Sequence, residues 1–167
     1  MKHAAIVFLF LLASAQRPTL VGDHVGNREP SAKPIAVHEH EAGGVDVALW
    51  EVKRTGPDVI TVKWSYTNKT GQRKQLTAES TGWPDPYRLV FEGYLMDDES
   101  RTKYPVMTDE KKNPVAPKHG GVNEYIYLGP HQTLKTWAKF AAPPAETKTI
   151  SVYIPRVEPF ENVPITK

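Results

Sequence analysis

Histidine and glutamate side chains cluster in one stretch of the chain, His38-Glu39-His40-Glu41, and His24 lies upstream of it. Residues two apart in an extended chain point to the same side, so His38 and His40 would present their imidazoles together, as a metal site requires. A stable site also needs partners that fix the ligands. The sequence therefore leaves two interpretations, metal binding by His24, His38 and His40, or a polar, mobile segment that happens to contain histidines.

A second group of candidate residues is aromatic. Trp83 and Tyr87 lie beside prolines in the stretch GWPDPY, residues 82–87. Two prolines cannot take part in a strand ladder, so this stretch is expected to be a connection. Aromatic rings on a connection offer large, rigid contact surfaces. We expect a ligand platform at Trp83 and Tyr87 or, alternatively, packing of these rings over the end of a sandwich.

Motifs for catalysis are weaker. Residues 119–121, HGG, are similar to an oxyanion-hole loop, but the sequence contains no G-x-S-x-G nucleophile motif. Residues 97–99, DDE, have the oxygens that Ca²⁺ prefers, and a solvated turn is the alternative interpretation. The chain has no cysteine, which excludes thiol catalysis and thiolate metal ligands. We therefore expect a protein that is not an enzyme and uses no cofactor.

The charges of the chain nearly balance. There are 21 Lys and Arg against 19 Asp and Glu, and the formal net charge is +2. This balance predicts no nucleic-acid partner and no polybasic site for anionic lipid. The length suits one domain with a hydrophobic core.

The N-terminus has the three parts of a secretory signal peptide. Residues 1–3 are basic, residues 4–12 (AAIVFLFLL) are apolar, and residues 13–15 (ASA) form a cleavage site. The apolar run is too short to span a bilayer, which takes about 20 residues. We assign residues 1–15 as a signal peptide and expect export to the periplasm or the extracellular space. A bacterial source is favoured, because small exported eukaryotic domains usually contain disulfides.

Residues 16–44 differ from the rest in composition. They contain Pro18, Pro30, Pro34 and three histidines, and neither a period of 2 nor one of 3.6 persists. We interpret them as a flexible leader and place the folded domain at residues 45–167.

Short strands at even spacing are expected from residue 45 onward. The clearest is residues 59–66, in which Ile60, Val62, Trp64 and Tyr66 alternate with mostly polar residues. Other expected strands are residues 73–78, 87–96, 103–107, 150–154 and 157–165, and the prolines in the third and fifth favour edge positions. No helical spacing interrupts them. The pattern predicts an all-β, immunoglobulin-like β-sandwich, with a barrel as the alternative.

Residues 122–142 are expected to form a hairpin inside this sandwich. Residues 122–128 and 134–140 each have a period of two, and Gly129-Pro130 between them is a turn signal. This stretch indicates architecture rather than chemistry.

Several of these segments resemble a known family. Residues 94–98 (YLMDD), 103–106 (KYPV), 128–132 (LGPHQ) and 137–144 (WAKFAAPP) resemble exported bacterial Ig-like domains of the DUF4352 kind. In those domains a Leu, Pro-Gly-Gln turn leads into a strand that ends Phe-x-x-Pro, and residues 129–132 here depart from Pro-Gly-Gln. The resemblance covers residues 45–165. It implies an uncharacterised cell-envelope or secreted sandwich, and no catalytic residues carry over.

Two classes of function follow from the sequence. The first is a non-catalytic binding or scaffolding module of the cell envelope, with a protein or glycan partner. The alternative is a periplasmic metal-handling protein that uses the histidine-containing leader.

We predict cleavage after Ala15 on export, because residues 13–15 match the small-residue pattern of signal peptidase sites. N-terminal sequencing of the exported protein should begin at Gln16. An envelope fraction in which the protein still begins at Met1 would contradict the assignment.

Overall fold

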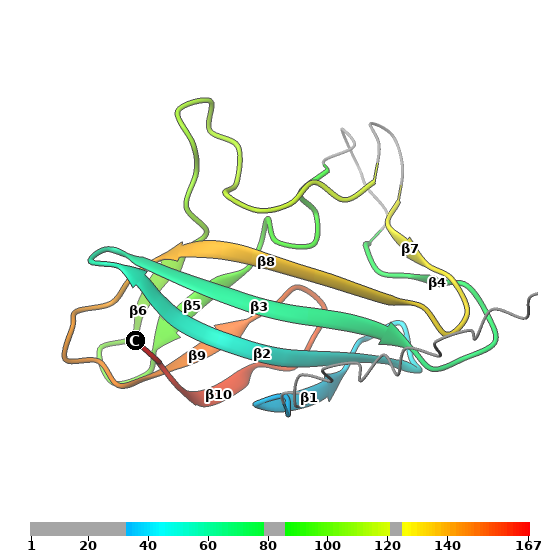
Figure 1. Cartoon of the computed structure of the whole chain (residues 1–167), viewed down its shortest axis with the longest axis horizontal. Coiled ribbons are helices and arrows are strands. Elements are labelled where there is room, and N and C mark those ends of the chain that lie inside the picture. The colour runs from blue at the N-terminus through cyan, green and yellow to red at the C-terminus, as the bar shows by residue number, and fades with distance from the viewer. Residues whose placement is uncertain (1–32, 79–85, 121–124) are drawn as a thin grey trace, which may run out of the picture. The chain divides into compact units, whose positions relative to one another are not determined.

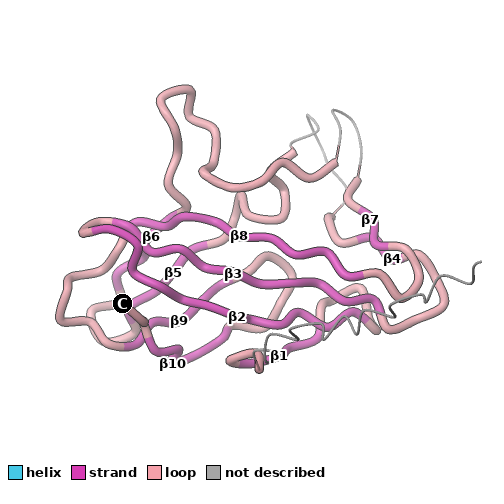
Figure 2. The backbone as a smooth tube through the Cα atoms, in the orientation of Figure 1, coloured by secondary structure: helices cyan, strands magenta, loops and turns pink. Residues whose placement is uncertain are grey.

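Ten strands and no helix form the part of the chain that the computed structural model describes, residues 33–78, 86–120 and 125–167 (Figures 1 and 2). The strands are β1 (Ala36–Glu39), β2 (Val45–Gly56), β3 (Val59–Asn68), β4 (Lys74–Gln75), β5 (Tyr94–Asp97), β6 (Thr102–Pro105), β7 (Tyr127–Leu128), β8 (Thr133–Ala141), β9 (Thr149–Tyr153) and β10 (Phe160–Pro164). None of these residues belongs to an apolar helix of membrane-spanning length. The predicted all-β class is confirmed.

The strands form a sandwich of two antiparallel sheets. One sheet has the order β1-β2-β3-β8 and the other has the order β10-β9-β5-β6, while β4 and β7 make a small separate pair. Figure 1 shows strands of the first sheet in front of those of the second. Both sheets contribute buried side chains to one core, including Leu49, Trp64 and Phe140 from the first and Leu95, Ile150 and Phe160 from the second. The proline-containing strands β6 and β10 lie at sheet edges, as predicted.

Strand β3 lies at the centre of the first sheet, with β2 on one side and β8 on the other. Its four inward side chains, Ile60, Val62, Trp64 and Tyr66, are each at most 2% exposed, so the predicted alternation is confirmed. Strand β8 alternates in the same way. A strand with both edges paired and one face buried has its register strongly specified.

Two segments cover the outer edge of β2. Strand β1 pairs with its first half, from Leu49 back to Asp46. The C-terminal tail pairs with its second half, where the N–H of Arg54 donates to Thr166 O at 2.8 Å and the N–H of Thr166 donates to Val52 O at 2.9 Å. Unpaired sheet edges promote aggregation, and this edge is covered along most of its length.

The expected start of the fold at Val45 is wrong. Strand β1, which falls inside the predicted leader of residues 16–44, is hydrogen-bonded to β2. The inward positions of β1, opposite Leu49 and Val47, are Ala36 and His38. Because one is small and the other is polar, β1 shows no apolar alternation in the sequence. Residues 1–32, which include the predicted signal peptide, lie outside the described residues.

The expected hairpin of residues 122–142 is also wrong. Strands β7 and β8 follow one another in the chain, but β7 pairs with β4 and β8 pairs with β3. The predicted strand of residues 87–96 is shortened to β5, because residues 87–93 form turns in which the N–H groups of Val90 and Phe91 donate to Tyr87 O. Strand patterns in sequence do not specify the partner strand, and a short apolar run fits a buried turn equally well.

Asn68 joins the end of β3 to the corner between β7 and β8. Its side chain is fully buried, and its Nδ2 donates to the carbonyl oxygens of Gln72, Leu128 and Gly129 at 2.6–3.2 Å. Its Oδ1 accepts from the N–H and the hydroxyl of Thr70. Buried polar groups that are fully hydrogen-bonded hold a corner in a single arrangement.

We predict that Trp64→Ala lowers the free energy of unfolding by about 3–5 kcal/mol, as large-to-small aromatic changes in cores do. Trp64→Phe should cost less, because an aromatic ring still fills most of the space and leaves a smaller cavity. Trp137→Ala, at a partly exposed position of β8, is the control and should cost less than Trp64→Ala, because less apolar surface is lost from the core. Urea unfolding measures all three, and an unchanged midpoint for Trp64→Ala would contradict the core assignment.

Candidate functional site

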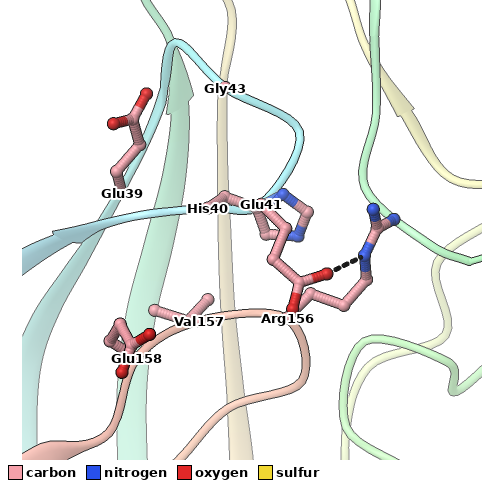
Figure 3. Close-up of a pocket in the computed structure, with 7 residues that line it drawn as sticks. All are labelled: Glu39, His40, Glu41, Gly43, Arg156, Val157 and Glu158. Carbon is pink, nitrogen blue, oxygen red and sulfur yellow. Dashed lines mark hydrogen bonds and ion pairs between the residues drawn. The ribbon is translucent and has the colours of Figure 1, made fainter.

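A polar hollow lies where the turn after β1 meets the connection between β9 and β10 (Figure 3). Its volume is about 410 Å³ and it is open to solvent. Three glutamates, a histidine and an arginine give it a polar lining, completed by a glycine and a valine. The lining residues are Glu39, His40, Glu41, Gly43, Arg156, Val157 and Glu158.

Backbone and side-chain contacts join the two segments of the hollow. His40 and Val157 form an antiparallel bridge, and the N–H of Glu41 donates to Arg156 O at 3.0 Å. The Nε of Arg156 donates to Oε2 of Glu41 at 3.0 Å, as Figure 3 shows. The carboxylate of Glu39 accepts the N–H of Gly44. Glu41 and Arg156 therefore hold the joint between the segments and Glu39 closes the turn after β1, which leaves less of their hydrogen-bonding capacity for a ligand.

His40 lies beneath the hollow and is 1% exposed. Its Nδ1 accepts the N–H of Ala42 at 3.0 Å, and its ring meets the Tyr66 ring edge-on at 5.8 Å between centroids. Burial, together with the nearby Arg156 charge, lowers the pKa of His40 to about 4. The imidazole is therefore neutral at physiological pH.

The predicted metal ligands are not brought together in the described residues. His38 stacks on Phe160 with ring centroids 4.3 Å apart, and its Nδ1 is 2.9 Å from Glu158 O. His38 and His40 do share a side of the strand, as the spacing predicted, but each is engaged with a different aromatic ring. His24 lies outside the described residues. Within those residues no three His, Asp or Glu side chains are placed to hold a metal ion.

Of the predicted aromatic platform, the structure describes only Tyr87. It lies in the turns that precede β5, where it is half-buried and packs against the core. Lys118 Nζ lies 5.9 Å from the centre of its ring. Tyr87 thus matches the alternative interpretation, packing over the sandwich. Trp83 lies outside the described residues.

The weaker catalytic motifs have structural roles where they are described. His119 Nε2 lies 2.8 Å from the Thr136 hydroxyl, and burial lowers the pKa of His119. Asp97 accepts the N–H groups of Glu99 and Ser100, which makes residues 97–99 a hydrogen-bonded turn. The polar loop before β7 returns to the sandwich, because the N–H of Lys139 donates to Val115 O.

Sequence reasoning missed an exposed aromatic surface on the first sheet. We define the outer face as the side of the β1-β2-β3-β8 sheet that points away from the core. Trp50 of β2 and Trp137 of β8 lie on it, each 37% exposed, together with the exposed Ile35 and Val37. These side chains belong to paired strands or lie directly beside one, so the surface they form is rigid.

Trp50 follows the inward-pointing Leu49, so strand alternation places it on the outer face, and a bulge occurs at this point. Leu49 pairs with Trp64 and Glu51 pairs with Lys63, so Trp50 is the extra residue between two rungs. Its Nε1 donates to the Ser65 hydroxyl on the neighbouring strand at 2.8 Å. Ser65 is buried although it points outward, which places the indole over it.

The outer face is also cationic. Lys53, Lys63, Lys135 and Lys139 lie on it. Glu51 is the one carboxylate in their rungs, and Glu39 and Asp46 lie on the same face in the next rung, where Asp46 pairs with Lys69. Lys63 and Glu51 form an ion pair at 2.9 Å. The near-neutral total charge of the chain conceals this local excess. The sequence did contain a sign of this surface. Lys135, Trp137 and Lys139 alternate with the inward-pointing residues of the strand predicted at 134–140, so the same alternation predicts that they point outward.

No family model, no curated protein and no solved structure matched this chain when it was compared with each. The resemblance to DUF4352-type domains therefore stays a prediction.

We predict that His40 makes the fold sensitive to acid. Its pKa of about 4 in the folded state lies below the unfolded value of 6.5, so the unfolded state binds the proton first as the pH falls. Stability should be full above pH 6.5 and should fall by about 3 kcal/mol as the pH approaches 4. His40→Asn keeps an acceptor for the Ala42 N–H and should remove this loss.

Urea unfolding at neutral and acidic pH measures the effect. His131→Asn, at an exposed turn position, is the matched control and should behave as wild type. Equal pH dependence in His40→Asn and wild type would show that other groups carry the acid sensitivity.

Proposed function

We propose that this chain is an exported, non-catalytic binding module of a cell envelope or of the extracellular space, and that the outer face is its contact surface. The signal-peptide pattern of residues 1–15 supports export. The β-sandwich supplies a rigid support on which such a surface can be presented.

The observation that carries the proposal is the exposure of two tryptophans on one sheet face. Large apolar side chains gathered on a surface mark interaction sites more often than chance exposure does. Tryptophan is also the residue type most enriched among those that dominate binding energy. Trp50 and Trp137 are held by paired strands, so little conformational entropy is lost when a partner covers them.

The distribution of titratable groups supports a non-catalytic role. Among the described residues, the groups with shifted pKa values are not gathered in one cleft: His40 and Tyr66 adjoin each other, while Asp109, His119 and Tyr153 lie on other segments. His40 and Tyr66 are buried, and His119 faces Thr136. The pKa of Asp109 is lowered mainly by hydrogen bonds from the backbone and side chain of Asn113 in a turn. Enzymes instead gather such groups around one cleft.

We predict that a Trp50→Ala, Trp137→Ala double variant loses binding to envelope material. The purified protein is mixed with insoluble envelope from the source cells, and the sedimented fraction is measured against concentration. Removing both indoles should raise the apparent Kd by at least about tenfold, because each buried anchor typically contributes more than 1 kcal/mol.

Phe91→Ala is the matched control, since Phe91 is 66% exposed and lies outside the outer face. It should bind as wild type does. Circular dichroism checks that each variant is folded. Wild-type binding by the double variant would overturn the proposed contact surface, and turnover of a substrate that depends on one His or Asp would overturn the non-catalytic role.

A further inference from the structure

We propose that the outer face binds an acidic polysaccharide, whose sugar rings stack on Trp50 and Trp137 while its carboxylates pair with the surrounding lysines. This inference rests on the proposed function and specifies the chemistry of the ligand. It follows from the placement of the two indoles, the orientation of Trp50, and the charge around them.

The register places the two indoles on either side of β3. Trp137 is opposite Lys63, and Lys63 is opposite Glu51, the residue after Trp50. Strands β2 and β8 are separated only by β3, so their backbones are about 10 Å apart. The two rings therefore lie on one face at nearly the same level, where a single extended chain can contact both.

The hydrogen bond of Trp50 determines what it offers to a ligand. Its N–H is already donated to the Ser65 hydroxyl, so the exposed part of the ring is its apolar surface. An apolar aromatic surface fits the C–H face of a sugar ring, which carries its hydroxyls around the edge. A ligand that needed a donor from this indole would be disfavoured.

Positive charge surrounds the two rings. Lys135 and Lys139 lie on either side of Trp137 at intervals of two residues, about 7 Å each along β8. Lys53 shares a rung with Lys139 through Thr61 between them. Within the described residues these three lysines form no ion pair, whereas Lys63 is paired with Glu51. Three uncompensated ammonium groups beside two indoles are complementary to a ligand that carries both sugar rings and anions.

The same charges disfavour two other occupants. In a twofold dimer the same patch faces itself, so the lysines of one copy would oppose those of the other. Insertion into a membrane would bury the lysine heads, because the tryptophans lie within flat strands and do not project on a loop. A flexible polyanion lying along the face meets neither difficulty.

The test uses the full exported chain and three carboxylated polysaccharides: polygalacturonate, alginate and hyaluronan. Dextran serves as the neutral polymer and phosphatidylglycerol vesicles as the anionic membrane. Calorimetry or affinity electrophoresis should detect binding to at least one acidic polymer, with affinity that falls as salt rises, and none to dextran or vesicles.

Variants then assign the site. Trp137→Ala should weaken binding at least tenfold, and a Lys135→Gln, Lys139→Gln double variant should weaken it and reduce its salt dependence. Phe91→Ala and Lys148→Gln, which alter an exposed aromatic and an exposed lysine elsewhere, should leave it unchanged.

Four results would overturn the inference: no binding to any of the three acidic polymers, equal binding to dextran, binding to vesicles alone, or tight binding that survives both outer-face variants. The first three leave the proposed function standing if envelope binding still depends on Trp50 and Trp137. Loss of that dependence as well would overturn both.

Discussion

The structure depends on the burial of one side of β3. Four large or branched side chains on this strand are removed from water, and each contributes roughly 1.5–3 kcal/mol in transfer free energy. The chain has no cysteine, so no disulfide supplements this core. Because β2 and β8 are hydrogen-bonded to the two edges of β3, the same burial orders all three strands together.

The outer face is a consequence of that constraint. A strand places alternate residues on opposite sides, so fixing the inward set of β3 and β8 also fixes the outward set. Lysines and Trp137 follow from this alternation. So does Trp50, which follows the inward Leu49, while the bulge at this point turns Glu51 outward as well. The proposed ligand surface thus combines a regular pattern with one local departure from it.

The buried polar side chains of the sandwich differ in their surroundings. Asn68 has every side-chain polar atom hydrogen-bonded and holds a corner between strands. His40 and Tyr66 are buried next to each other with their rings edge to face, and burial disfavours a charge on either one. Added charge is therefore costly in the region behind the polar hollow.

The sequence by itself determined the all-β class, the alternation of β3 and β8, and the edge positions of β6 and β10. These features are local, because a period of two or a proline can be recognised within a few residues of sequence. Only the tertiary structure decided that β1 joins the sheet, that β7 and β8 have different partners, and that Trp50 lies near Trp137. Strand pairing joins residues far apart in the chain, and the period of a strand does not indicate which other strand is its partner.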